Sequence, residues 1–123
     1  MMTRLWLAIA GLGGMASVIA GALAAHLVDA PQTAELLRTG ALYGSVHAAA
    51  LLAVIALTPG GEQRRGVAVI AGSCFALGIV LFSGSLFALA AGGARWLGWV
   101  TPFGGTALIV GWMGVAALAL PRR

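Results

Sequence analysis

The sequence contains few charged residues, a single cysteine and no lysine. Charged residues make up 8% of its 123 residues and hydrophobic residues 61%, which gives a mean hydropathy of +1.03. Because a water-soluble domain usually has about a quarter of its residues charged, this composition excludes one and predicts an integral membrane protein. With Cys74 as its one cysteine, the chain can form neither an intrachain disulfide nor a zinc-type cysteine cluster.

Acidic residues are equally scarce, and only Asp29, Glu35 and Glu62 carry negative charge. The 7 basic residues are all arginines, which lie singly or in pairs beside apolar runs and give a net charge of +4. This arrangement is typical of the short loops that orient a membrane protein. A nucleic-acid surface needs a basic stripe on a water-facing element, which the chain does not contain. We therefore expect the lipid bilayer, and no nucleic acid, as a partner.

Long apolar runs dominate the rest of the chain, at residues 5–25, 41–57, 66–90 and 102–120. A spanning helix needs about 20 apolar residues, so residues 1–123 predict one domain, an all-α transmembrane bundle of four helices. A cleavable signal peptide is the alternative interpretation of the first run, because "ALAA" resembles a cleavage site. That run has 21 residues, whereas the apolar part of a signal peptide has about 7 to 15, so we expect a retained span.

The segments between these runs carry turn and helix-start signals. Pro31 can open a helix, and the amphipathic turn after it predicts a short interfacial helix before the second span. The sequence "TPGGEQRR" (58–65) predicts a tight polar turn, and residues 91–99 predict a glycine-rich turn. Thr101 is typical of an N-cap, with Pro102 at the first position of the fourth helix.

The arginines predict the orientation of the bundle. With four spans, both termini and the 58–65 turn share one side, which then holds five arginines against two on the other. Arginine-rich short loops stay in the cytoplasm, so we expect both termini there and the segments 26–41 and 91–100 outside.

Small residues are expected to hold the helices together, because helix association in lipid relies on close backbone approach and interhelical hydrogen bonds. Gly13, Ser17, Gly21 and Ala25 recur every four residues and predict a smooth ridge on the first helix, packing within the chain or against another copy. We expect further packing positions at Gly78, Gly84, Gly104, Gly105 and Gly111.

Polar side chains are expected at a similar depth in all four helices. The apolar segment "IVLFSGSLFALA" (79–90) carries two hydroxyls, and the other helices have their polar groups in the same outer half. The predicted cluster, a structural element or a ligand site, consists of His26, Tyr43, His47, Ser83, Ser85 and Thr101. In the structural alternative, His47 bonds Ser83 or Ser85 across the bundle, or each serine bonds a carbonyl of its own helix.

The chain also resembles a known family. "GALAAH" (21–26), "YGSVHAAALL" (43–52), "GIVLFSGSLFAL" (78–89) and "GWVTPFGG" (98–105) are similar to the signature segments of the YgdD-type family. Its members are small inner-membrane proteins of unknown function, related to an uncharacterised vertebrate mitochondrial membrane protein. The resemblance implies a four-span fold in a bacterial inner membrane and interest in the polar residues above, but it implies no activity.

Three classes of function remain open. We favour a non-enzymatic packing or accessory protein, alone as a homo-oligomer or in a larger membrane complex, that could hold a lipophilic molecule. A transporter or channel formed by an oligomer is the first alternative, and a haem or copper carrier using His26 and His47 is the second. A serine–histidine enzyme would pair His47 with Ser83 or Ser85, but no third residue is available to orient the imidazole, so we expect no catalysis and no resident cofactor or metal.

The predicted topology can be tested with single cysteines. Gln32→Cys and Gly61→Cys, each in a Cys74→Ser background, should react with a membrane-impermeant thiol reagent from opposite sides, and Gln32→Cys from outside. Labelling of both from the same side would exclude four spans with cytoplasmic termini.

Overall fold

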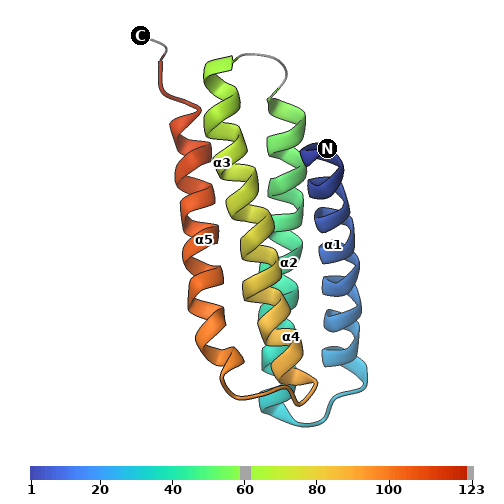
Figure 1. Ribbon diagram of the computed structural model, residues 1–123. Helices are drawn as coiled ribbons and strands as arrows, with labels where there is room; N and C mark the ends of the chain where they lie inside the picture. The colour runs from blue at the N-terminus through green and yellow to red at the C-terminus, as the bar shows by residue number, and fades with distance from the viewer. Residues whose placement is uncertain (59–61, 122–123) are drawn as a thin grey trace.

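The computed structural model describes residues 1–58 and 62–121, and of residues 62 and 63 only the backbone. Within these ranges the chain is helical with short connections and contains no strand. Of the expected turn at 58–65, residues 59–61 lie outside the described ranges, and residues 62–65 belong instead to the helix that begins at Glu62. The elements, shown in Figure 1, are α1 (Met2–His26), α2 (Pro31–Leu57), α3 (Glu62–Gly78), the π-helical turn η1 (Ile79–Ser83), α4 (Gly84–Ala90) and α5 (Leu97–Ala117).

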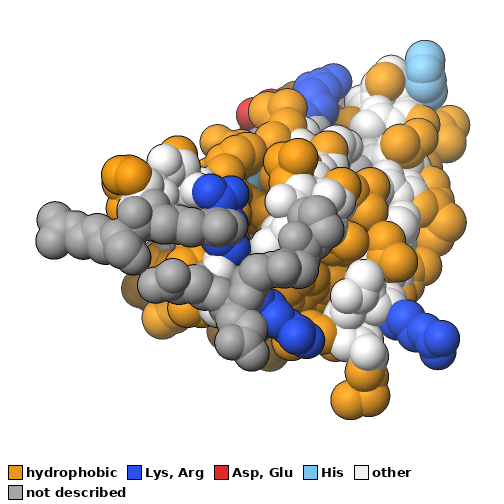
Figure 2. Space-filling view, turned by 90° about the horizontal axis from the view of Figure 1, so that it is seen from above, with side chains coloured by type: hydrophobic (Ala, Val, Ile, Leu, Met, Phe, Trp, Pro, Cys, Tyr) orange, Lys and Arg blue, Asp and Glu red, His pale blue; other side chains and the backbone are white. Residues whose placement is uncertain are grey.

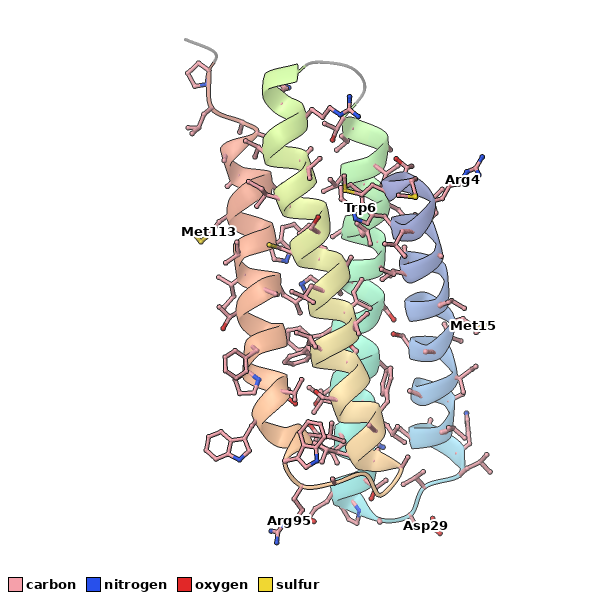
Figure 3. All side chains as sticks on the ribbon, viewed as in Figure 1. Arg4, Trp6, Met15, Asp29, Arg95 and Met113 are labelled. Atoms are coloured by element: carbon pink, nitrogen blue, oxygen red, sulfur yellow. The ribbon has the colours of Figure 1, made fainter. Side chains whose placement is uncertain are left out.

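Helices α3, η1 and α4 follow one another without a break and form a single third column, so the described chain is a bundle of four columns (Figure 1). All four are long and apolar enough to span a membrane. Met1 and the end of α5 lie at one end of the bundle, here called the terminal end. The connections α1–α2 and α4–α5 lie at the other, the loop end. Figure 3 shows Arg4 at the terminal end and Asp29 and Arg95 at the loop end.

Two columns are central and two are peripheral. Helix α2 packs against α1 and against all three parts of the third column, whereas α5 packs mainly against the third column. The most apolar windows of α2 and of the third column are accordingly 39% and 44% buried, against 22% for α1 and 17% for α5. Met15 on α1 and Met113 on α5 point outward, while Trp6 points into the bundle (Figure 3). Hydrophobic side chains cover the flanks that are visible in Figure 2, as a lipid-facing surface requires.

The central position of α2 follows from its sequence spacing. One line of buried residues advances by alternating steps of three and four, the period of left-handed helix packing. This line consists of Ala34, Leu37, Ala41, Gly44, Ala48 and Leu51. A second buried line, with steps of seven, consists of Gly40, His47 and Val54. Helix α2 therefore has two contact faces, and a buried histidine lies on the second.

The buried face of α1 differs from the ridge that the sequence predicted. Ala10, Ser17 and Ala24 are buried, at intervals of seven residues, whereas Ala25 is exposed. A four-residue step rotates about 40° further round the helix each time, so the line through Gly13 and Gly21 drifts away from the contact. A side chain at Gly21 would still meet only the Ala41 methyl group, at 3.9 Å.

Small residues allow close approach between α5 and the third column. A Cβ on Gly104 would overlap the backbone nitrogen of Phe82 and lie 2.8 Å from the Leu81 carbonyl carbon. One on Gly111 would lie 2.6 Å from the Phe75 ring. At the remaining glycines that were expected to pack, the space for a Cβ is tight at some positions and ordinary at others. Gly13 and Gly78 lie against Ile79 and Leu108, and Gly105 leaves ordinary contact with Phe82.

The expectation that Gly84 packs against a neighbour is wrong. Gly84 is exposed, and a Cβ there would meet nothing within 4 Å. Its place on the outer face of α4 follows from the extra residue in the π-turn before it, which rotates the chain relative to a regular α-helix.

Two predicted element boundaries are also wrong. The interfacial helix expected before the second span is not separate, because α2 runs without interruption from Pro31 to Leu57, about 40 Å. A helix of that length exceeds the hydrocarbon layer of about 30 Å, so its polar first turns can lie at the interface in line with the span. Helix α5 begins at Leu97, so Thr101 is no N-cap and Pro102 lies inside the helix. As the sixth residue of α5, Pro102 has no N–H to donate to the carbonyl oxygen of Gly98, so one helical hydrogen bond is missing there.

The backbone approach at Gly104 predicts a matched pair of variants. Gly104→Ala should lower the free energy of unfolding in mild detergent by about 1–3 kcal/mol or more, because the methyl group overlaps backbone that cannot rotate away. Gly84→Ala, in the adjoining column, should change it little. Equal effects of the two substitutions would contradict this packing.

Candidate functional site

His47 is the buried histidine at the centre of the bundle, with 4% of its surface exposed. Its Nδ1 lies 2.6 Å from the carbonyl oxygen of Tyr43, one turn earlier on α2. Its Nε2 accepts a hydrogen bond of 2.9 Å from the indole Nε1–H of Trp112 on α5. Both ring nitrogens are therefore engaged, one within α2 and one across to α5.

These two partners assign the protonation state of the ring. A carbonyl oxygen only accepts and an indole N–H only donates, so Nδ1 must carry the proton and Nε2 must be the acceptor. The imidazole is thus neutral in this arrangement. Because both nitrogens are used, neither is free to bind a metal or to activate a nucleophile.

Aromatic rings enclose the histidine. Tyr43 stacks on it with ring centroids 5.9 Å apart, and Phe75 and Trp112 approach at 5.7 and 5.9 Å. Phe75 and Trp112 also meet edge to face, and Tyr43 contacts Phe82 of η1 at 4.8 Å. The aromatic cluster, Tyr43, His47, Phe75, Phe82 and Trp112, links α2, the third column and α5 around the buried imidazole.

The two serines of the π-turn region bond different helices. The Ser83 hydroxyl donates to the carbonyl oxygen of Gly40 on α2, at 2.8 Å. Beside this bond, Ser17 of α1 faces Gly44, where any Cβ would overlap the Ser17 hydroxyl and lie 3.1 Å from that of Ser83. Three columns therefore meet at Gly44, which is the reason that no side chain fits there.

Ser85 joins α4 to α5 near the loop end. Its hydroxyl donates to the Phe82 carbonyl oxygen at 2.9 Å and lies 2.6 Å from the Thr101 hydroxyl. A hydroxyl has one proton, so with Ser85 donating to Phe82, Thr101 donates to Ser85. Both alternatives expected for the serines thus occur together at Ser85, a bond to its own helix and a bond across to another.

The structure divides the expected polar cluster into separate parts. His47 contacts neither serine through a hydrogen bond, and the expected pairing of His47 with Ser83 or Ser85 is wrong. The reason is rotational, since both serines are turned toward Gly40 and Thr101. His26 lies exposed at the last position of α1, away from the aromatic cluster. The arrangement brings no second histidine to His47, as a haem or copper site on these two residues requires.

Trp112, the partner of His47, was not among the site residues predicted from the sequence. Tryptophan in a membrane protein usually marks the interface, and Trp96 and Trp99, at the start of α5, are exposed. Trp112, however, lies in the middle of the fourth apolar run, where its N–H needs a partner. This position could have predicted the contact, because the polar ring of His47 lies about as far from the start of α2 as Trp112 lies from the start of α5.

Two hollows flank these interior contacts. One, the α1/α2/α4 cavity, has a volume of about 430 Å³ and lies near the loop end. Its lining residues are Met15, Ala16, Ile19, Ala20, Leu23, Val28, Thr33, Leu37, Phe87, Ala90 and Ala91. The other, the α2/α5 groove, has about 400 Å³ and runs along the aromatic cluster. Its lining residues are Tyr43, Val46, His47, Phe82, Gly105, Leu108, Ile109 and Trp112.

The hydrogen bond between His47 and Trp112 should appear as a coupling energy. In a double-mutant cycle of His47→Phe and Trp112→Phe, we expect a coupling of about 0.6–1.7 kcal/mol in the free energy of unfolding, the range of side-chain hydrogen bonds in membrane proteins. The control cycle, His47→Phe with Ser83→Ala, should be additive within about 0.5 kcal/mol. Coupling in the control and none in the first cycle would refute the assignment.

Comparisons with known proteins agree with this architecture. The family described as "Protein of unknown function (DUF423)" matches residues 20–105. The chain is 36% identical to the UPF0382 inner membrane protein YgdD of Escherichia coli K12, over 100% of this chain and 96% of that protein. It is 37% identical to a UPF0382 membrane protein of Haemophilus influenzae, over 94% and 93%.

A Gram-positive relative extends the comparison. The UPF0382 membrane protein YwdK of Bacillus subtilis is 31% identical, over 95% of this chain and 97% of that protein. No solved structure matches the chain. The resemblance to the YgdD-type family is thereby confirmed, and the chain belongs to the DUF423 (UPF0382) family of membrane proteins of unknown function.

Proposed function

We propose that this protein is a non-enzymatic membrane protein that retains the hydrocarbon part of a lipid in the α1/α2/α4 cavity. The observation that carries the proposal is the lining of the cavity, in which Thr33 is the single polar side chain among eleven residues. A cavity of about 430 Å³ falls within the usual range of small-molecule sites, about 300–1,000 Å³. An apolar lining gives no bond to a polar solute but full contact to a hydrocarbon chain.

The location of the cavity supports the same proposal. Met15 and Leu23 on its rim are exposed on α1, so a chain can enter sideways from the bilayer without crossing a polar region. Deeper in, Ala16 and Ala20 leave the space that larger side chains would fill. The cavity therefore offers a lipid chain a fixed position beside α1.

The interior polar groups support a binding role over a catalytic one. Within the described residues, every buried side-chain nitrogen and oxygen has a hydrogen-bond partner. Ser83 and Ser85 are held by a carbonyl and a hydroxyl, and His47 lies against neither. A serine–histidine mechanism needs the nucleophile within hydrogen-bond reach of its base, which this geometry does not provide.

Orientation and association form part of the proposal. We place the terminal end in the cytoplasm, because five of the seven arginines belong by sequence to the two termini and the 58–65 segment, and the α1/α2/α4 cavity consequently in the outer leaflet. The exposed faces of α1 and α5 leave room for further copies or for a larger membrane complex, and association of either kind stays a prediction.

Filling the cavity tests the proposal. Native mass spectrometry of the wild-type protein from mild detergent should show a retained lipid, and Ala16→Phe should remove it by occupying the cavity. Ala22→Phe places the same side chain on the exposed face of α1 and should leave the lipid bound. Equal retention in both variants, or no retained lipid in the wild-type protein, would refute the proposal.

A further inference from the structure

The α2/α5 groove exists because the fourth column, α5, packs against the third column and not against α2. Helix α5 packs against α3, η1 and α4 and makes few close approaches to the backbone of α2. The hydrogen bond from Trp112 to His47 crosses the intervening space, and the groove of about 400 Å³ lies beside it. Tyr43 and Trp112, which line it, are 43% and 46% exposed, so the groove opens toward the bilayer.

One polar group in this groove is left without a partner. The His47 nitrogens and the Trp112 N–H bond one another or the α2 backbone. None of the side-chain hydrogen bonds among residues 1–58 and 62–121 includes the Tyr43 hydroxyl. The groove therefore presents a single free donor on an otherwise apolar and aromatic wall.

The depth of Tyr43 makes this hydroxyl costly. Tyr43 lies twelve residues after Pro31, about 18 Å along a helix of about 40 Å, and so close to the middle of α2. The polar first turns of α2 lie at the interface, however, so Tyr43 lies in the outer part of the hydrocarbon layer, and its side chain, inclined toward the helix start, brings the hydroxyl toward the boundary of that layer. Water is scarcer there than outside the layer, so a hydroxyl without a partner costs free energy.

We propose that the α2/α5 groove binds a lipophilic molecule with a planar, carbonyl-bearing ring of the quinone class, and that the Tyr43 hydroxyl donates a hydrogen bond to its carbonyl oxygen. A carbonyl is the acceptor that complements a lone donor. The ester carbonyl of a bilayer lipid offers the same chemistry, but it belongs to a flexible chain and carries no ring. The rings of Tyr43, Phe82 and Trp112 also suit a flat ring better than a flexible chain.

This site is separate from the one under Proposed function. The α1/α2/α4 cavity and the α2/α5 groove share no lining residue. An experiment can therefore refute one of the two proposed sites without refuting the other.

The test measures binding of a decyl-substituted 1,4-benzoquinone to the protein in nanodiscs of a diether lipid, which contains no ester carbonyl. Quenching of tryptophan fluorescence gives the affinity, and infrared difference spectra report the carbonyl stretch. The wild-type protein should bind saturably and shift that stretch to lower wavenumber. Tyr43→Phe, which removes only the hydroxyl, should bind about five- to tenfold more weakly and lose the shift.

Two leucine variants of α5 test the location. A Cβ at Gly105 would make ordinary contact with Phe82 at 3.5 Å, so Gly105→Leu fits the backbone while its outer carbons fill the groove, and it should abolish binding. Gly98→Leu enters open space on the same helix and should bind like the wild-type protein. Ala16→Phe, in the other cavity, should also leave the quinone affinity unchanged.

Three results would overturn the proposal. The first is an absence of saturable binding to the wild-type protein, and the second is equal affinity and an equal carbonyl shift in Tyr43→Phe. The third is loss of quinone binding in ester-lipid nanodiscs together with a Tyr43-dependent shift of the ester stretch, which would assign the hydroxyl to bilayer lipid. Folding is controlled by thermal unfolding, and Tyr43→Phe should not lower the unfolding temperature because the hydroxyl bonds no protein group.

Discussion

The position of α5 depends on one approach of backbone to backbone, that of Gly104 to η1. In lipid the hydrophobic effect does not draw helices together, so the distance between two columns is set by what lies between their backbones. Glycine at this point lets α5 lie against the chain at Leu81 and Phe82. The bond from Thr101 to Ser85, less than a turn away, and that from Trp112 to His47, two turns away, both need α5 at this distance.

Side-chain hydrogen bonds join the columns in an uneven way. The third column is bonded to α2 through Ser83 and to α5 through Ser85, and α2 is bonded to α5 through His47. Helix α1 has one such link, from the Arg38 guanidinium to the Ala24 carbonyl at the loop end, where α1 leaves its last carbonyls unpaired. Elsewhere α1 is held by packing alone, of small residues and of Trp6, which lies against Gly72 of α3, and the α1/α2/α4 cavity borders it.

The fold was predictable from the sequence to the level of columns, and the partners of the polar residues were not. Length and apolar composition require four spans and place Ser83, Ser85 and Thr101 at similar depth, and the latter two indeed meet. Depth alone leaves the direction of each side chain open, however. The partner of His47 lay in Trp112, which looks like any apolar residue of the fourth run when only depth and hydropathy are considered.

The predicted boundaries of the helices were wrong for a related reason. Hydropathy locates the end of the hydrocarbon layer, but a helix can continue past that end, as α2 does at Pro31 and α5 does at Leu97. The spacing of small residues on α1 predicted a four-residue ridge, whereas the contact follows a seven-residue line through Ser17. The same sequence is compatible with either line of contact, and the angle at which the neighbouring helix crosses α1 determines which line is used.

The π-turn at Ile79–Ser83 gives the third column two different orientations. One extra residue in a turn advances the following side chains by about 100° relative to an unbroken α-helix. Upstream, Phe75 is directed into the aromatic cluster; downstream, Ser85 is directed at Thr101 and Gly84 at the surface. The side chains of α4 are therefore rotated by a fixed angle about the column axis relative to those of α3. Deleting one residue from the turn would leave the column apolar, but it would direct every side chain of α4 toward a different neighbour.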